Sequence, residues 1–221
     1  MNKIRMILMT KSYKHNNYCV AGFELRSGKW IRLVSSKTLD NAIKKEVIDD
    51  PPKKECLDVI EVKIIERVPL NCQTENCLIN EKDPISIVAK LQIDDILNSK
   101  FLDDYDFIFG NGDKCISEDV ATKLDYSLTF VLVQSFTVAI NYNDEYGKWM
   151  NKCSFWYKGR LYTDISLTDP EYRKEEYNGK NFGNVALVMS LSAVPYENDG
   201  MYYKFVAKVF EYQEHLWFYK N

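Results

Sequence analysis

Long runs of β-branched and aromatic residues, broken by short turns, constrain the fold of this chain most. The strongest run is SLTFVLVQSFTVAINY, residues 127–142, and residues 57–70 form a second run in which polar and apolar positions alternate. Such runs between turn residues are typical of β-strands. Other segments of the same character predict further strands over residues 4–10, 18–25, 30–36, 184–196 and 201–212.

Helical signals are few and short. Residues 38–50, with Thr38 as a candidate N-cap, and residues 92–102 and 118–124 each fit one short helix. Residues 106–117 are expected to form a hairpin. Because strands dominate and Gly and Asn punctuate them, the pattern favours small barrels over an α/β sheet. We therefore predict a mainly β protein with few short helices.

A short sequence echo accompanies this pattern. SGKWIR, residues 27–32, resembles YGKWMN, residues 146–151, and each places Gly-Lys in a turn before a Trp that opens the next strand. Glycine accepts the positive φ that such turns use. The echo is compatible with two related barrels, one in each half of the chain.

Charge is distributed unevenly along the sequence. The 221 residues carry a net charge of −3, so a nucleic-acid ligand would require local basic patches. Residues 1–37 hold eight Lys or Arg against one acid, whereas residues 94–125 hold nine acids against three lysines. The basic segment is a candidate for phosphate contacts. The acidic segment, residues 94–125, is a candidate surface for a basic protein partner.

The sequence offers little that would hold a cofactor or a metal. Cys72 and Cys77 are the closest cysteines, and neither belongs to a CxxC pair. No P-loop and no GxGxxG is present. The first apolar run is short for a signal peptide, and no run reaches the length of a membrane span. We expect a cytoplasmic protein that has no cofactor, no structural metal and no membrane association.

Five segments that span nearly the whole chain form a recognisable set: TKSYKHNNYCVAGFEL, SGKWIRLVS, LDVIEVKII, YKGRLYTDISLTDPEYR and YKFVAKVF. Together they resemble the bacterial dual OB-containing domain family. The resemblance implies two tandem small OB-like β-barrels, which we assign to residues 1–110 and 111–221. It also implies binding to nucleic acid, because OB barrels use an open strand face and adjoining loops for this purpose. The family supplies no catalytic residues to transfer.

The first candidate site combines basic and aromatic residues of the N-terminal segment. Lys and Arg contact phosphates, and flat aromatic rings stack on bases. Strand alternation places Trp30 and Arg32 on the face opposite to Ile31 and Leu33. The alternative is that Trp30 is a core residue with Arg32 exposed above it. The candidates are Lys11, Tyr13, Lys14, Trp30 and Arg32.

The second candidate site is a hairpin that turns at Gly159. Aromatic and basic residues interleave on its two strands, which would suit a single strand of nucleic acid. Ordinary cross-strand pairing on a solvated face is the alternative. The candidates are Trp156, Lys158, Arg160 and Tyr162, and we add Arg173 as a further basic residue of the same region.

The segment DISLTDPEYR, residues 164–173, supports two interpretations. Asp164 and Asp169 are close enough in sequence to share a metal ion, as in a nuclease. Alternatively, Thr168 or Asp169 caps a short helix that begins with Pro170. No third acid lies at a spacing that would complete a metal site, so we favour the interpretation of Thr168 or Asp169 as a helix cap.

The sequence as a whole favours a nucleic-acid-binding module without catalysis. A metal-dependent enzyme acting on nucleic acid is the first alternative, and a protein-interaction module is the second. Single-stranded or structured nucleic acid is the expected partner, and the residues do not distinguish DNA from RNA.

Overall fold

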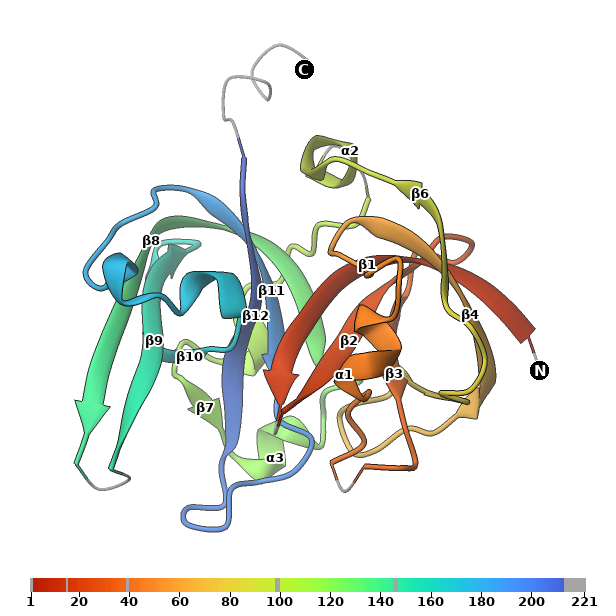
Figure 1. The fold of residues 1–221 in the computed structure, drawn as a ribbon. Coiled ribbons are helices and arrows are strands. Elements are labelled where there is room, and N and C mark those ends of the chain that lie inside the picture. Colours follow the sequence, from red (N-terminus) through yellow and green to blue (C-terminus); the bar gives the residue numbers. More distant parts are fainter. Residues whose placement is uncertain (1, 15, 39, 98–99, 145–146, 213–221) are drawn as a thin grey trace.

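The computed structural model describes residues 2–14, 16–38, 40–97, 100–144 and 147–212, apart from the side chains of residues 2 and 14 (Figure 1). Strands dominate, as the sequence predicts. The elements are β1 (Asn2–Lys14), β2 (Asn17–Glu24), β3 (Trp30–Val34), α1 (Lys45–Asp49), β4 (Asp58–Arg67), β5 (Asn76–Ile79), β6 (Ser86–Lys90), α2 (Ile93–Leu97), η1 (Ile108–Gly110), β7 (Cys115–Ile116), α3 (Glu118–Ala121), β8 (Leu128–Asn143), β9 (Lys148–Tyr157), β10 (Arg160–Leu167), η2 (Pro170–Tyr172), η3 (Glu175–Tyr177), β11 (Val185–Leu191) and β12 (Tyr202–Glu211).

Strands β1 to β5 close the first barrel. Their order is β1-β2-β3-β5-β4, and β4 pairs back with β1. The β3–β5 pair is parallel, and the other pairs of the barrel are antiparallel. Alternate residues of these strands point inwards, so that Leu8, Val20, Ile31 and Ile60 share one buried core. This is the closed five-stranded arrangement of an OB barrel.

Strands β8 to β12 repeat the same arrangement in the second barrel. Their order is β10-β9-β8-β11-β12, and β10 and β12 close the barrel through a parallel pair. Phe136, Val138, Phe155 and Tyr162 lie in its core. The protein is thus mainly β, with two OB-like barrels in tandem. The division between residues 110 and 111 stays a prediction.

The Gly-Lys-Trp echo does not relate equivalent hairpins. Trp30 opens β3, the third strand of the first barrel, whereas Trp149 lies at the start of β9, the second strand of its barrel. The two barrels correspond in topology, but the echoed residues occupy different positions in it.

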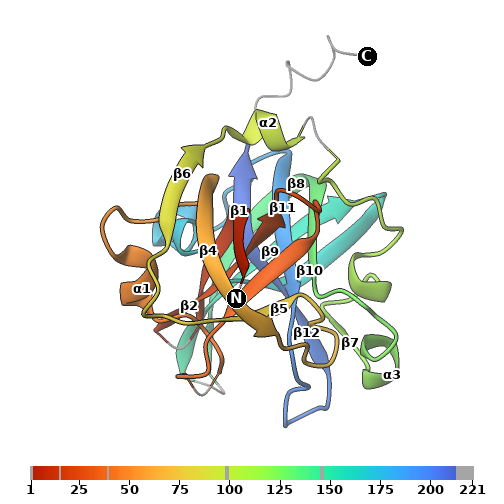
Figure 2. The ribbon, with the colours of Figure 1, turned by 90° about the vertical axis from the view of Figure 1, so that its right-hand side faces the viewer.

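A third apolar core joins the barrels along a boundary that we call the seam. Phe23 and Ile7 of the first barrel pack with Phe130, Val188 and Phe210 of the second. Burial of each such side chain contributes about 1.5–3 kcal/mol, so the seam is a substantial interface. The barrels lie side by side in Figure 1, and Figure 2 looks at the first barrel with the second behind it.

The local elements differ from the sequence predictions in several places, and β5 and β6 form in a segment for which the sequence predicted no strand. The predicted cap at Thr38 is wrong, because α1 begins at Lys45 and the Thr38 hydroxyl donates to the Ala42 carbonyl at 2.8 Å. The predicted hairpin over residues 106–117 is also wrong. Its first part forms η1, and β7 pairs with β12 instead of with its own neighbour. Within the described part of the chain, no helix combines the length and apolar character that crossing a bilayer requires.

Candidate nucleic-acid interface

Arg32 does not lie on an open face, contrary to the sequence prediction. Only 6% of the residue is exposed, and its guanidinium donates to Glu75 Oε1 at 3.0 Å and to Ser127 Oγ at 2.8 Å. Glu75 belongs to the first barrel, and Ser127 directly precedes β8. The alternation of β3 is as predicted, but the partner of its outer face is the second barrel of the same chain.

Trp30 belongs to the same contact and packs as the alternative interpretation predicts, although that interpretation left Arg32 exposed. It is half-buried against the third core, and its ring lies 4.0 Å from the ring of Phe23. Burial raises the pKa of the neighbouring Asp103, although hydrogen bonds from the Phe130 backbone N–H and the Thr129 hydroxyl act against the rise. The indole thus lies near a carboxylate inside the seam.

The surface that OB barrels use for ligands is occupied in the first barrel. That surface comprises the second and third strands, the loop between the first and second strands and the loop between the fourth and fifth. Here the latter loop, residues 68–75, docks on the second barrel. Asn71 donates to the Ala193 carbonyl at 2.8 Å, and Thr74 donates to the Asp125 carbonyl at 2.6 Å. With β2 and β3 packed in the seam, this face is closed to a ligand.

The second predicted cluster lies on β9 and β10, but its members are separated. Trp156 is 42% exposed, whereas Tyr162 is fully buried in the core. Lys158 Nζ lies 2.6 Å from Asp104 Oδ1, and the Arg160 guanidinium lies 4.0 Å above the ring of Phe107. The basic residues thus hold part of the acidic segment, residues 94–125, against the second barrel.

Asp164 and Asp169 have different partners. Asp169 is buried, accepts from the backbone N–H of Glu171 at 3.1 Å and lies beside Lys208, so it caps η2 as the favoured interpretation predicts. Asp164 pairs with Lys114 at 2.5 Å and with Lys152 at 3.4 Å. Burial acts to raise the pKa of Asp164, but the two lysines outweigh it and lower this pKa.

The remaining candidates meet where the two barrels adjoin. Lys11 is largely buried and pairs with Glu55 at 2.5 Å. Lys14 ends β1, with its side chain outside the described part of the structure. Tyr13 and Arg173, far apart in sequence, line one cavity of about 470 Å³ together with Asn16 and Lys45. We call this cavity, lined by Tyr13, Asn16, Lys45 and Arg173, the seam pocket.

A pair of exposed aromatic residues stands beside the seam pocket. Tyr142 of β8 pairs in register with Trp149 of β9, and their rings lie 5.4 Å apart in an edge-to-face contact. They are 50% and 64% exposed. We call Tyr142 and Trp149 the hairpin platform. With the Asn151 amide oriented so that its oxygen faces Arg173, the guanidinium donates to that oxygen at 3.1 and 3.2 Å and so reaches the same hairpin.

The platform continues the row of inward-facing side chains of the second barrel, which we call the interior stripe. On β8 the sequence of inward positions is Phe136, Val138 and Ile140, and the next such position is Tyr142. On β9 the buried Cys153 is followed outwards by Asn151 and then Trp149. Because the hairpin extends past the mouth of the barrel, residues of core-facing parity become exposed there.

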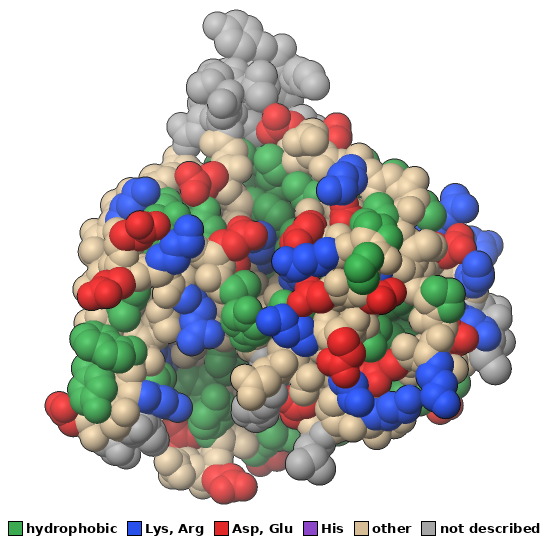
Figure 3. Space-filling model, viewed as in Figure 1, with side chains coloured by type: hydrophobic (Ala, Val, Ile, Leu, Met, Phe, Trp, Pro, Cys, Tyr) green, Lys and Arg blue, Asp and Glu red, His purple; other side chains and the backbone are tan. Residues whose placement is uncertain are grey.

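The surrounding surface is hollowed and carries positive charge. Figure 3 shows apolar side chains over the free end of the β8–β9 hairpin, a recess between this end and the β1–β2 hairpin, and Lys and Arg side chains around the recess. Lys180 lies 4.5 Å above the ring of Phe182, and Lys174 lies 5.3 Å above the ring of Tyr177. The cations thus sit on an aromatic cluster at the mouth of the second barrel.

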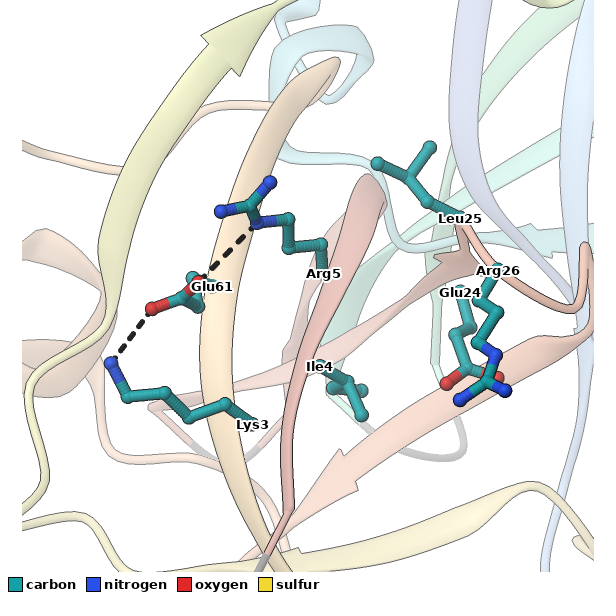
Figure 4. Close-up of a pocket in the computed structure, with 7 residues that line it drawn as sticks. All are labelled: Lys3, Ile4, Arg5, Glu24, Leu25, Arg26 and Glu61. Carbon is teal, nitrogen blue, oxygen red and sulfur yellow. Dashed lines mark hydrogen bonds and ion pairs between the residues drawn. The ribbon is translucent and has the colours of Figure 1, made fainter.

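A larger cavity on the first barrel is a weaker candidate. It measures about 770 Å³ and is drawn in Figure 4. Lys3 and Arg5 both pair with Glu61, at 2.8 and 3.3 Å, and these contacts lower the pKa of Glu61. Because two of its three cations are already paired with a carboxylate, this cavity offers less positive charge to a phosphate.

The profile of one protein family matches residues 4–209, which is most of the chain. The chain belongs to the dual OB-containing domain family. The closed strand order found twice in the structure is the arrangement that this family description names.

Two solved structures are similar to this chain at low identity and low TM-score. One is described as a murine DNA binding protein bound with ds DNA, with 6% identity, a TM-score of 0.36, and coverage of 96% of this chain and 100% of that one. The other is the Ifi202 HINa domain in complex with 20bp dsDNA, with 11% identity, a TM-score of 0.40, and coverage of 96% and 97%. Among curated proteins, none matches the sequence.

Sequence reasoning missed several residues of the candidate interface in this dual OB member. Lys45 and Asn16 approach Arg173 only because the barrels pack together. Tyr142 and Trp149 carried a local signal: both flank a Gly147 turn and share parity with apolar residues of the flanking strands. Extending that parity through the turn would have identified the platform.

Proposed function

We propose that the protein binds single-stranded or locally unpaired nucleic acid on the surface formed by the hairpin platform and the seam pocket. The observation that carries the proposal is the interior stripe of the second barrel, which ends in two exposed aromatic residues, Tyr142 and Trp149, beside Arg173. Exposed apolar residues at a barrel mouth, next to cations, suit a ligand with flat rings and negative charge.

The chemistry of the residues supports an unpaired strand. Trp149 and Tyr142 offer ring faces and edges to unstacked bases, which a duplex keeps stacked inside. Arg173 and Lys45 supply sequence-independent phosphate contacts. Since phosphate contacts and base stacking carry little sequence information, binding is expected to be tolerant of base sequence.

Replacing Trp149 by alanine is expected to weaken binding of a labelled single-stranded oligonucleotide by roughly 1–3 kcal/mol, the usual loss for one stacked base. The melting temperature should stay close to that of the unchanged protein, because 64% of Trp149 is exposed. Fluorescence anisotropy and differential scanning calorimetry measure the two quantities. Trp156→Ala, at the opposite end of β9, is the matched control and should retain affinity. Loss of affinity in Trp156→Ala alone would move the site to the β9–β10 turn.

Replacing Arg173 by glutamine is expected to lower the slope of log affinity against log salt by about one, because one phosphate contact is lost. A titration series from low to moderate salt measures this slope. Lys158→Gln, whose ammonium is engaged by Asp104, should leave it unchanged. An unchanged slope in the Arg173 variant would contradict a phosphate contact at the seam.

The alternatives from the sequence gain no specific support. Asp164 and Asp169 are engaged by different lysines, so a shared metal ion has no carboxylate pair to hold it. Part of the acidic segment, at Asp103 and Asp104, is engaged within the chain. A basic protein partner for residues 94–125 and a cytoplasmic location stay predictions.

A further inference from the structure

The seam pocket has a chemistry that sets it apart from the platform beside it. In the described part of the chain its four lining residues are one aromatic, one amide and two cations, with no carboxylate among them. Tyr13 and Lys45 come from β1 and α1 of the first barrel, whereas Arg173 follows η2 of the second. Two positive charges therefore converge from opposite sides of the seam.

Contacts behind the pocket fix two of its side chains. The ring of Tyr13 stacks on Tyr18 at 5.6 Å with 17° between the planes, and the Tyr18 hydroxyl donates to Asp49 at 3.2 Å. Asn151 holds the guanidinium of Arg173 through two hydrogen bonds. Side chains that are oriented before binding lose less conformational entropy when a ligand arrives.

We propose that the seam pocket binds the terminal phosphomonoester of a nucleic-acid strand, with the end base against Tyr13. This inference rests on the proposed function. A monoester carries about 1.5 to 2 negative charges at pH 7, more than the single charge of an internal phosphodiester. The paired cations Lys45 and Arg173 match that charge. Asn151 engages the Nε–Nη2 edge of the Arg173 guanidinium, so the Nη1–Nη2 edge would donate two hydrogen bonds to phosphate oxygens.

The position of the pocket fits the end of a strand that lies on the platform. Trp149 and Asn151 are two residues apart on β9, so they share one side of the strand at a spacing of about 7 Å. Asn151 contacts Arg173, which lines the pocket. A strand whose bases stack on Trp149 and Tyr142 thus has the pocket within reach of its next phosphate.

The test compares three versions of one short oligonucleotide: 5′-phosphorylated, 3′-phosphorylated and unphosphorylated at both ends. One phosphorylated version is expected to bind about tenfold more tightly than the unphosphorylated strand, as an added charge-assisted contact provides. In the double variant Lys45→Gln/Arg173→Gln this preference should disappear. Lys3→Gln/Arg5→Gln, on the far side of the first barrel, is the matched control and should keep it. All four substituted side chains are exposed, so both double variants should fold.

Each outcome decides between the two proposals. Equal affinity of all three strands for the unchanged protein overturns the phosphate inference and leaves nucleic-acid binding intact. A preference that survives in the Lys45/Arg173 double variant also overturns it, because the phosphate then binds elsewhere. Failure of all three strands to bind the unchanged protein contradicts the proposed function, and the inference falls with it.

Discussion

Replacing Arg32 by methionine is expected to lower the free energy of unfolding by about 3–5 kcal/mol, the usual cost of removing one partner of a buried ion pair. Glu75, only 5% exposed, would keep its negative charge inside the seam without a cation. Ser127, which hydrogen-bonds the same carboxylate oxygen, would be its remaining polar partner. Urea denaturation followed by tryptophan fluorescence measures the change.

Two further variants separate the ion pair from other effects of Arg32. In Arg32→Met/Glu75→Gln most of the lost stability should return, because no uncompensated charge is left. Lys3→Met breaks an exposed pair with Glu61 and should cost less than about 1 kcal/mol. An Arg32→Met protein that melts normally but binds oligonucleotide with a lower salt slope would restore the original prediction of a phosphate contact.

Replacing Lys204 by methionine is expected to change how stability depends on pH. Lys204 is fully buried, and its ammonium donates to the carbonyl and the side-chain oxygen of Asn111, both at 2.7 Å. The Asn111 carbonyl also accepts from the Tyr162 hydroxyl, and the Asn111 side-chain oxygen also accepts from the backbone N–H of Asp113. Burial lowers the pKa of Lys204 to about 7. The side chain thus carries a cost of desolvation that the attraction of Asp113 offsets only in part.

The direction of this pH dependence of stability follows from proton binding. Below pH 7 Lys204 is charged in both the folded and the unfolded state, so its burial is fully unfavourable. Between pH 7 and the ordinary lysine range the unfolded state binds a proton that the folded state has released, and stability rises with pH. The stability advantage of Lys204→Met over the unchanged protein should therefore shrink by roughly 2–3 kcal/mol from pH 7 to pH 9.

Lys208→Arg is the control for this pH dependence. Burial acts to lower the pKa of Lys208, but Asp169 and Glu171 outweigh it and raise this pKa. The side chain stays charged in both states across this range, as arginine does. The difference between this variant and the unchanged protein should be flat from pH 7 to pH 9. A flat difference for Lys204→Met as well would show that Lys204 titrates normally.

Strand alternation and turn chemistry made the barrels predictable. The run at residues 127–142 corresponds to β8. Gly28, Gly147 and Gly159 adopt positive φ in the turns between strands. These features are local, because each depends on neighbours in sequence. The η1 segment was not predictable in the same way. Phe109 has φ of 52°, and it is buried in the second barrel by contacts that no local pattern encodes.

The candidate interface was predictable only in part, for a physical reason. Alternation placed Arg32 on the outer face of β3, but it gave no sign that another barrel covers that face. Tyr13 and Arg173, both candidates from the sequence, are exposed in the structure, and their role in ligand binding stays a prediction. Their meeting in one pocket depends on how Phe23, Phe130 and Phe210 pack across the seam. Sequence patterns specify faces of elements, and the packing of those faces specifies sites.

The loop at residues 68–75 has a consequence for any attempt to divide the molecule. Cys72 of this loop packs in the core of the second barrel and is 1% exposed. Cutting the chain between the barrels would remove Cys72 from that core. It would also expose the apolar residues of β2 and β3 to water. We therefore expect the two halves, expressed as separate chains, to be insoluble alone and to reassemble when refolded together.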